Sequence, residues 1–467
     1  MSDPPGKDPR PIAIIVASAL FMQNLDSAAV ATALPSMARS LEVEPARLGV
    51  AITAYLVSLT VFIPFSGWVA DRFGAKRVFM FAILLFIAAS AACGLAQDLT
   101  HLVLARIVQG LGGAMMVPVG RLLLLRGLRK DQMLTAMAWL TMPGMLGPIS
   151  GPVLGGVLTD LFGWRSVFWI NVPVGVMGLL LVAWKIPDPG RQDPGPPDIP
   201  GLLLVGGALA GLMFGIETVG RGVLPPLWPW LALAAGLLVG VLALRHCRRA
   251  ARPALDLSLL EVPSFRAATL PGTLFRVGAG ASPFLVPVLL QAGFGWGATE
   301  SGLVSFATAL GALAMKPLAQ PILRWLGFRT TVVWAGLLAG VSLAACALFD
   351  ASWPLWAMFL LLAVGGLFRS LQFTALNTLA FADLPPARLS AATGFFGMAQ
   401  QISPALGVVL ATATLEASAA MAGRHEVAAA DFSIAFVVAA LVLASATPFF
   451  LRLPPAIGRE VSGHKGR

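Results

Sequence analysis

The chain of 467 residues is 57% hydrophobic and only 12% charged, with a mean hydropathy of +0.83 and a formal net charge of +10. Soluble domains are about 25% charged, so a water-soluble globular protein is excluded, and the same apolar excess excludes a disordered chain. The basic residues form short clusters between apolar runs, unlike the single basic face of a nucleic-acid-binding protein. The three cysteines, Cys93, Cys247 and Cys346, are too far apart for a disulfide framework or a metal-ligand pattern.

Apolar runs long enough to cross a bilayer recur along the whole chain. A membrane helix needs about 20 predominantly apolar residues, and fourteen such runs are separated by short polar breaks. They are predicted within residues 11–37, 48–70, 78–96, 102–120, 132–159, 166–184, 199–218, 224–244, 267–294, 301–323, 330–349, 353–382, 389–415 and 432–451. We interpret the first run as an uncleaved span, because a signal peptide would have a shorter apolar core. The connections are too short for a soluble domain, so the function is expected inside the bilayer.

The positions of Lys and Arg predict the orientation of these spans. Basic residues near span ends tend to stay on the cytoplasmic side. With the amino terminus inside, 23 of the 32 Lys and Arg residues lie on the cytoplasmic side and 5 on the outer side. Both termini are therefore predicted to be cytoplasmic. The excess positive charge then reflects membrane topology and not an acidic partner.

An internal repeat predicts the domain organisation. The stretch 47–76 is similar to 300–329, and the Arg106-Ile-Val-Gln109 sequence is similar to Arg369-Ser-Leu-Gln372, each eight spans later. We therefore predict an amino-terminal six-helix bundle (11–184), two inserted membrane helices with cytoplasmic flanks (185–266) and a carboxy-terminal six-helix bundle (267–453). Parallel halves of this kind are typical of transporters, with the substrate site near the midplane.

Asp26 is the only carboxylate deep inside a predicted span, whereas Glu217 and Glu416 stand near span ends. A charged group at the membrane centre costs about 2.5–3.5 kcal/mol on insertion scales, so it indicates function by default. The predicted partner is Arg106 in the fourth span, since an arginine can hold a carboxylate bidentately and does not lose its proton. We expect this pair to couple transport to protons. The alternatives are a fixed structural pair or a hydrated aspartate, and for Arg106 a bracing role on backbone carbonyls.

A short charged segment follows the second span. We predict a cytoplasmic loop from Gly67 to Arg77, in which Asp71 either caps a helix or pairs with an arginine of a neighbouring span, locking one access state. A tight turn with topological charges would explain its basic residues, though not Asp71.

The fifth span carries glycines at spacings that place them on one helix face. Gly144, Gly147, Gly151 and Gly155 follow one another by three and four residues. Small residues allow a second helix to approach closely, and Pro148 and Pro152 can bend the span where neighbours re-satisfy the backbone.

Polar, aromatic and methionine side chains within the spans are candidates for a substrate cavity, since aromatics and flexible methionines suit promiscuous binding. The candidates are Met22, Gln23, Tyr55, Gln109, Met142, Phe275, Arg369, Gln372, Phe373 and Asn377. Helix packing or lipid contact is the alternative for the apolar members. Arg369 could also mirror Arg106 in the repeat, and Lys316 is expected to extend toward the interface.

Five sequence motifs, each in its expected span, resemble one family. They are Leu25-Asp26 through Leu34-Pro35, Gly67 through Arg77, Arg106 through Ala114, Gly144 through Gly156, and Trp164-Arg165 through Gly175. Over nearly the whole chain, the sequence resembles the fourteen-span drug:proton antiporters of the major facilitator superfamily, the EmrB/QacA type.

The resemblance implies an all-α polytopic protein of the bacterial inner membrane, with two six-helix bundles and two inserted helices. It implies proton-coupled export of amphipathic organic compounds by alternating access, with small-molecule substrates and protons as partners and no cofactor. It also assigns a cytoplasmic gating loop (Gly67, Asp71, Arg72, Gly74, Lys76, Arg77) and an antiporter motif (Gly144, Gly147, Pro148, Gly151, Pro152, Gly155, Gly156). The chain departs from the family pattern at Ala31, where Asn is common, and at Arg324, which stands where the repeat would place the counterpart of Asp71.

Other functions remain as alternatives. Export of one specific metabolite or lipid fits the same architecture, because a fold does not determine a substrate. A membrane enzyme or a transporter-like sensor is disfavoured, since the sequence has no phosphate-binding loop, no His-Glu-x-x-His and no Gly-x-Ser-x-Gly motif. A periplasmic adaptor is not inferable from the sequence, and neither is the role of the seventh and eighth spans.

Overall fold

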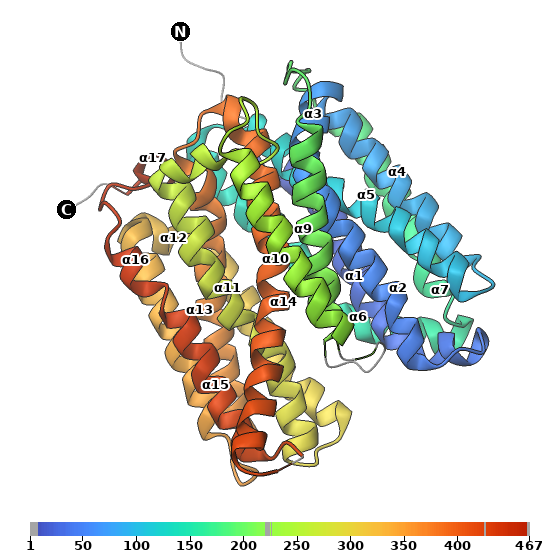
Figure 1. Cartoon of the computed structure of the whole chain (residues 1–467). Coiled ribbons are helices and arrows are strands. Elements are labelled where there is room, and N and C mark those ends of the chain that lie inside the picture. Colours follow the sequence, from blue (N-terminus) through green and yellow to red (C-terminus); the bar gives the residue numbers. More distant parts are fainter. Residues whose placement is uncertain (1–7, 220–224, 226, 425, 465–467) are drawn as a thin grey trace. The chain divides into compact units, whose positions relative to one another are not determined.

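The computed structural model describes residues 8–219, 225, 227–424 and 426–464, apart from the side chains of residues 45, 46, 144, 145, 148, 149, 298 and 299. This described part consists of helices and their connections (Figure 1). The α-helices are, in chain order, α1 Arg10–Ser40, α2 Pro45–Phe62, α3 Ser66–Phe73, α4 Ala75–Gly94, α5 Leu99–Arg126, α6 Met133–Phe162, α7 Ser166–Trp169, α8 Asn171–Lys185, α9 Ile199–Thr218, α10 Leu227–Cys247, α11 Pro263–Val288, α12 Ala298–Ala345, α13 Leu355–Ala382, α14 Leu389–Met421, α15 Ala429–Ala444, α16 Thr447–Leu451 and α17 Arg459–Ser462.

Most of these helices are long enough to cross a bilayer. Among the described residues, twelve helical segments have the length and apolar composition of membrane spans. Helices suit this environment because they satisfy every backbone hydrogen bond within the segment. One of the twelve runs through α12, which is interrupted at Gly327, and α6 is a further helix of 30 residues outside that count. The predicted all-helical, multi-pass protein is therefore confirmed, while the number of fourteen spans stays a prediction.

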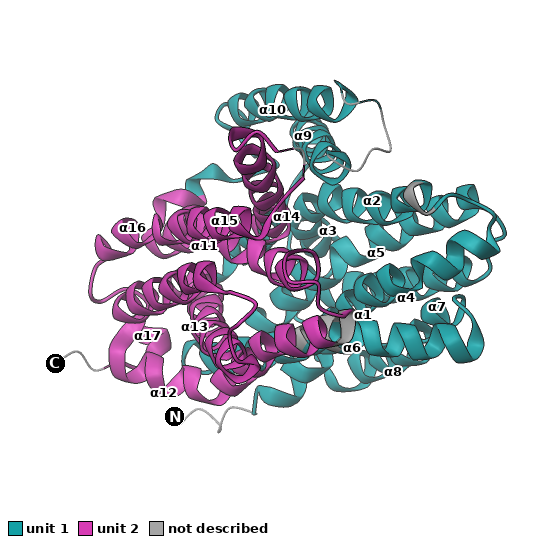
Figure 2. Ribbon diagram, turned by 90° about the horizontal axis from the view of Figure 1, so that it is seen from below, with its two compact units in different colours: residues 1–258, 385–398 teal, residues 259–384, 399–467 magenta. Residues whose placement is uncertain are grey.

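The chain divides into two compact units (Figure 2). Unit 1 contains Met1–Ser258 and Pro385–Met398, and unit 2 contains Leu259–Leu384 and Ala399–Arg467. The first turns of α14 thus belong to unit 1 and the rest of that helix to unit 2. The three-part division predicted from the sequence stays a prediction.

Helices α9 and α10, which correspond to the predicted inserted pair, pack on each other, and α9 also packs on α2 in unit 1. Their contact is close at two glycines: a Cβ atom at Gly236 would lie 2.5 Å from the backbone nitrogen of Leu212, and one at Gly211 would lie 2.9 Å from the Cα atom of Gly236. Close approach of small residues is a common way to hold membrane helices together.

The sequence repeat has a counterpart in the backbone. Gly74 separates α3 from α4 with φ 95°, and Gly327 interrupts α12 with φ 72°. These two glycines occupy equivalent places in the repeat, and each adopts a conformation that side chains with a Cβ atom disfavour. In both units, therefore, a single glycine with a positive φ ends one helix of the repeat and allows the next to begin.

The interior of unit 1 positions the residues singled out above. On α1, Asp26 precedes Ala29, Val30 and Ala33 on one buried face. These alanine and valine side chains join a buried apolar cluster with residues of α2, α4, α5 and α7, among them Phe168. The aspartate is therefore carried by the side of α1 that faces other helices.

Candidate functional site

Asp26 lies at the centre of a hydrogen-bonded cluster that joins three helices of unit 1. Arg106 Nη1, from α5, donates to Asp26 Oδ2 at 2.6 Å and to Gln109 Oε1 at 2.7 Å. The other carboxylate oxygen, Asp26 Oδ1, accepts from Gln109 Nε2 at 2.9 Å and from Asn171 Nδ2, in α8, at 2.8 Å. The spacing of Arg106 and Gln109, three residues apart on α5, presents both side chains to the same carboxylate.

This cluster is removed from solvent. Asp26 and Arg106 are each 1% exposed, Gln109 is 0% and Asn171 is 1% exposed. Burying an unpaired charge costs far more free energy than burying one that is paired and hydrogen-bonded. The two opposite charges and the two amides therefore form one electrostatic unit, and each charge depends on the other for its stability inside the helices.

Aromatic rings and a serine complete the surroundings of the pair. The Arg106 guanidinium carbon lies 4.2 Å from the centre of the Tyr55 ring and 5.9 Å from that of Phe168. Contact of a guanidinium with an aromatic face is favourable, the more so when both are desolvated. Asn171 Nδ2 also donates to Ser90 Oγ at 3.0 Å, and Ser90 Oγ donates to the Phe168 carbonyl at 2.9 Å. Asn171 is therefore oriented from α4 as well as from α1.

Helix α1 is held against α6 through the glycine face predicted in the fifth span. A Cβ atom at Gly147 would lie 2.8 Å from the Leu25 backbone nitrogen, and one at Gly155 would lie 2.8 Å from the Ala29 Cα atom; one at Gly151 would collide with the Ala28 side chain. These contacts flank Asp26 along α1. The glycines thus let α6 approach the backbone of the helix that carries the buried carboxylate.

The other described residues of the predicted antiporter motif, Gly156 and Pro152, are less closely packed. A Cβ atom at Gly156 would meet nothing within 4 Å, and Pro152 is exposed. Gly144 and Pro148 belong to α6, but their side-chain surroundings lie outside the described residues.

The prediction of a loop from Gly67 to Arg77 is wrong in its local structure. Residues up to Phe73 belong to α3, and α4 begins at Ala75, so Gly74 alone separates two helices. A single glycine suffices because its positive φ turns the chain without further residues. The charged residues therefore sit on helix ends rather than on a loop.

Asp71 is bonded to two distant parts of unit 1. Its carboxylate forms an ion pair with Arg126, at the end of α5, and accepts a hydrogen bond from Ser390 Oγ, in the first turn of α14, at 2.5 Å. Of the two predicted possibilities, the structure has the arginine pair. The same place is tightly packed, since a Cβ atom at Gly67 would lie 2.5 Å from the Ser390 carbonyl oxygen.

The basic members of the predicted gating segment are more peripheral. Lys76 Nζ donates to the Ala183 carbonyl at 3.0 Å, and exposed Arg72 lies 3.8 Å from exposed Asp193. Arg77 is also exposed. Exposed ion pairs contribute little to stability. Of the residues in the predicted gating segment, Asp71 therefore has the bonds that matter most for holding the helices together.

Of the remaining cavity candidates of unit 1, Tyr55 contacts Arg106, and Gln23 lies near Tyr55. A Cβ atom at Gly113 would lie 3.4 Å from the Tyr55 hydroxyl and 3.6 Å from Gln23 Oε1, so both side chains face that glycine. Met22 is 2% exposed, whereas Met142 is half-buried on α6. No described contact joins Met142 to the others.

The candidates of unit 2 form separate contacts. The rings of Phe275 and Phe373 meet edge to face at 5.4 Å, and Asn377 Oδ1 accepts from Gln400 Nε2 at 2.8 Å. Gln372 is fully buried, and neither atom of its amide has a hydrogen-bond partner among the described residues.

Arg369 does not reproduce the surroundings of Arg106. Its Nε donates to the Gly365 carbonyl at 3.3 Å and its Nη2 to Thr308 Oγ1 at 3.3 Å. Within the described residues no ion pair involves Arg369, although the residue is only 8% exposed. The repeat therefore conserves a buried arginine without a buried carboxylate beside it.

The expectation that Lys316 extends to the interface is wrong. Lys316 is 5% exposed, and its ammonium donates to Thr374 Oγ1, on α13, at 3.2 Å. Extension to the interface requires a free path for the side chain, and α13 packs closely on α12 at this point, where Ser370 Oγ also donates to the Ala312 carbonyl.

Several bonding partners were not predicted from the sequence. They are Asn171 and Ser90 around Asp26, Arg126 and Ser390 around Asp71, and Gln400 beside Asn377. Asn171 had a sequence signal, since it is an amide at the start of an apolar span. Among the described residues, no group of three or more His, Cys, Asp or Glu side chains is placed to hold a metal ion.

Comparisons with known proteins relate this architecture to transporters. Two proteins named "Putative multidrug resistance protein MdtD" are 36% and 34% identical to the chain. The first, from Klebsiella pneumoniae subsp. pneumoniae, matches over 95% of this chain and 94% of that protein; the second, from Pectobacterium atrosepticum, over 94% and 95%. A third protein of that name, from Salmonella paratyphi A, is 37% identical over 85% of this chain and 84% of its own length.

Solved structures of the same fold are more distant in sequence. The human organic anion transporter MFSD10 (TETRAN) superposes with a TM-score of 0.68 at 15% identity, covering 96% of this chain and all of that one. The proton:xylose symporter XylE superposes with a TM-score of 0.65 at 14% identity, covering 97% of each chain. The sequence model of the Major Facilitator Superfamily matches residues 16–244 and 272–466. The chain belongs to the major facilitator superfamily.

Proposed function

We propose that the protein is a proton-coupled secondary transporter that exports amphipathic organic compounds. Membership of a transporter superfamily and identity of 34–37% to proteins named as multidrug resistance proteins support this function. The observation that carries the mechanism is the buried pair of Asp26 and Arg106, with its amide partners Gln109 and Asn171.

The coupling follows from the charge balance of this cluster. When a proton binds Asp26, the carboxylate loses the charge that holds Arg106, and the pair changes from an ion pair to a buried cation beside a neutral acid. Such a change of several kcal/mol favours a different arrangement of α1 and α5. A substrate that binds next to Tyr55 and Gln109 then competes with the proton for the same cluster, which links the two binding events.

The energy available to such a cycle is sufficient for export. One elementary charge moved through 100 mV is worth about 2.3 kcal/mol, which corresponds to a substrate gradient of roughly 50-fold. The bonds of Asp71 to Arg126 and Ser390 suit a latch that holds one access state until the cluster changes its protonation.

We further propose fourteen spans, with both termini in the cytoplasm of a bacterial inner membrane. Two features support this number: α6 is long enough to span the bilayer, and Gly327 divides the 48 residues of α12 into two separate crossings. The residues 11–184 and 267–453 would then form the two six-helix bundles.

The test is transport by the full-length protein in proteoliposomes with an imposed pH gradient and a panel of cationic, neutral and anionic dyes. We expect several amphipathic dyes to move in exchange for protons, and Asp26→Asn to abolish the dependence on the gradient. Asp160→Asn is the matched control, because Asp160 is an exposed carboxylate of α6. Unchanged proton dependence in Asp26→Asn would refute the proposed coupling.

The same panel separates the alternative substrates. Movement of a single compound class, with no response to the others, would indicate a dedicated exporter of one metabolite or lipid. If no compound moves while expression of the protein changes transcription, the sensor alternative is favoured.

A further inference from the structure

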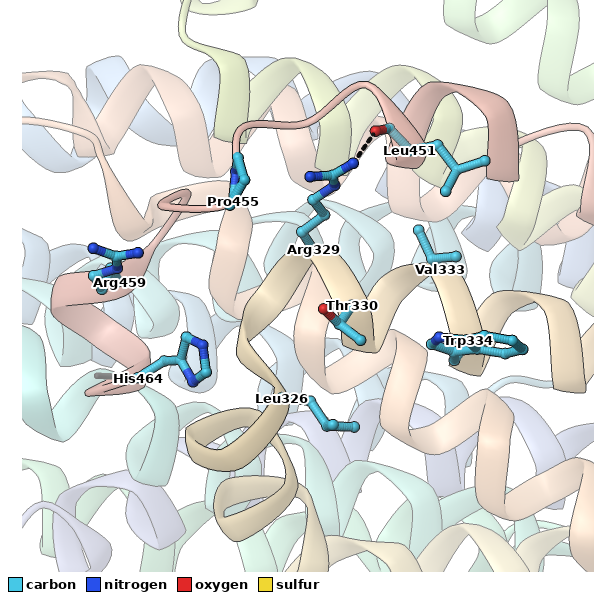
Figure 3. A pocket seen from close by; sticks show the side chains of 9 residues that line it. All are labelled: Leu326, Arg329, Thr330, Val333, Trp334, Leu451, Pro455, Arg459 and His464. Atoms are coloured by element: carbon cyan, nitrogen blue, oxygen red, sulfur yellow. Dashed lines mark hydrogen bonds between the residues drawn. The ribbon is translucent and has the colours of Figure 1, made fainter. Parts of the chain in front are cut away.

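A pocket in unit 2, away from the Asp26 cluster, combines positive charge with an apolar wall. It has a volume of about 300 Å³ and lies between the corner of α12 that follows Gly327 and the carboxy-terminal segment after α16 (Figure 3). Arg329, Arg459 and His464 line it, and no Asp or Glu is among its lining residues. Glu460, next to Arg459 in sequence, is not part of the lining.

Part of the wall of this pocket is apolar and exposed. Leu326 and Val333 of α12 are half-buried there, while Trp334 is 55% exposed and Leu451 is 51% exposed. In a membrane protein, exposed apolar side chains on a spanning helix face lipid chains, and tryptophan is enriched at the level of the head groups. The pocket therefore complements a phospholipid: its basic residues suit the head group, and its apolar residues suit an acyl chain.

The carboxy-terminal segment that forms one side of the pocket is anchored to unit 2. Arg329 Nη2 donates to the Leu451 carbonyl at 2.9 Å, and the His464 ring lies within hydrogen-bond distance of the Arg324 carbonyl, at 3.0 Å. Ile457 and Val461 are buried, and Gly458 packs so closely that a Cβ atom there would lie 2.7 Å from the Phe328 ring. The lining residues thus stand on a fixed scaffold.

We propose that this pocket binds the phosphate head group of an anionic phospholipid, with an acyl chain along Trp334 and Leu451. The predicted topology places both the 324–329 corner and the carboxy terminus on the cytoplasmic side, where anionic lipids attract basic segments by about 1 kcal/mol per residue. Phosphate recognition by a pair of arginines is favoured by the planar, multiply donating guanidinium group. The site is independent of the transport mechanism proposed above.

The test measures lipid binding to the delipidated full-length protein by native mass spectrometry. Phosphatidylglycerol, phosphatidylcholine and inorganic phosphate are added separately. We expect phosphatidylglycerol to bind at least about fivefold more tightly than phosphatidylcholine, and Arg459→Gln to weaken phosphatidylglycerol binding about fivefold, the equivalent of about 1 kcal/mol. Arg459→Lys is expected to retain most of the affinity.

Arg452→Gln is the matched control, because Arg452 is an exposed arginine of the same segment that does not line the pocket. Equal losses in Arg452→Gln and Arg459→Gln would overturn the proposal in favour of general surface charge. Trp334→Ala distinguishes the source of the phosphate: it is expected to weaken lipid binding. If inorganic phosphate displaces the lipid at equal concentration and Trp334→Ala has no effect, the pocket is a free-anion site instead. Because Arg459 is exposed, the melting temperature of Arg459→Gln without lipid is expected to equal that of the unmodified protein.

Discussion

The two units treat a buried arginine in opposite ways. In unit 1, Arg106 shares its hydrogen bonds with the Asp26 carboxylate and with Gln109, and all three side chains are at most 1% exposed. In unit 2, Arg369 occupies the equivalent position of the repeat but donates to a threonine hydroxyl and a backbone carbonyl. Both units thus have a buried guanidinium at this position of the repeat, but among the described residues only in unit 1 is it bonded to a carboxylate.

This difference predicts that the two units respond differently to protons. An ion pair responds to a proton, because protonating the carboxylate removes one of two charges. An arginine bonded only to neutral groups has no such response, since its own proton is not lost. The described carboxylate buried in unit 2, Asp431, lies in the first turn of α15 and pairs with Arg424. A buried pair of an acid and a base that responds to a proton in the membrane interior is therefore expected in unit 1.

The largest effect is expected from breaking the charge pair of unit 1. Arg106→Gln leaves the Asp26 charge buried without its partner, which costs about 3–5 kcal/mol of unfolding free energy. The measurement is unfolding by SDS titration in mixed micelles. The double variant Asp26→Asn with Arg106→Gln is expected to recover most of the loss, and a double variant no more stable than Arg106→Gln would show that the two charges do not depend on each other.

The next effect tests a feature that the two units share. Gly155→Val forces α6 away from α1, and Gly407→Val forces α14 away from α11, since a Cβ atom at Gly407 would collide with the Val277 carbonyl. Both are expected to lower the unfolding free energy by about 1–3 kcal/mol. Gly156→Val is the control, because nothing lies within 4 Å of its Cβ position. Loss of stability in only one of the two glycine variants would show that the close packing is not common to both units.

A smaller effect is expected where the repeat differs at the end of the second helix. Ser390→Ala removes a hydrogen bond to Asp71 and is expected to cost about 0.5–1.5 kcal/mol, measured by the same titration. Arg324 is the counterpart of Asp71 in unit 2, and its side chain is exposed. We therefore expect Arg324→Gln to change the unfolding free energy by no more than about 0.5 kcal/mol. Equal effects of the two changes would contradict the asymmetry.

A smaller effect than that of Ser390→Ala is expected from Arg369, the buried arginine of unit 2. Arg369→Gln gives up two hydrogen bonds but leaves no carboxylate behind, so the change in unfolding free energy is expected to be below about 1 kcal/mol, since losing bonds and losing a buried charge offset each other. In proteoliposomes, the proton dependence of transport should stay unchanged. A loss as large as that of Arg106→Gln would reveal that Arg369 also neutralises a charge.

Much of the fold could be predicted from the sequence because membrane helices are encoded by local composition. The apolar runs and the glycine face of the fifth span rest on residues near one another in the chain, and the repeat is found by comparing two such local stretches. The pairing of Asp26 with Arg106 could also be proposed, because a bilayer interior leaves so few charges that the possible partners are few.

The partners that could not be predicted are common polar residues brought from far along the chain. Ser390 lies 319 residues from Asp71, and Asn171 lies 145 residues from Asp26. A serine or an asparagine in a span can form hydrogen bonds with many different groups, so the residue type does not identify the bonding partner. The predicted position of Lys316 is wrong for the opposite reason. A lysine side chain in a span is expected to reach the membrane interface, but the close packing of α12 on α13 encloses this one.

The separation of Asp26 and Arg106 along the chain also has a consequence for biogenesis. Arg106 follows Asp26 by 80 residues, so at synthesis rates of about 5–20 residues per second the ribosome adds it roughly 4–16 s later. During that interval α1 carries an acidic group that has no countercharge in the membrane. The nascent helix must therefore wait in a protonated or hydrated form, at the insertion machinery or at the membrane surface, until α5 arrives. A helix that carries a buried carboxylate in the folded protein thus has to keep that group protonated or hydrated from the start of its synthesis.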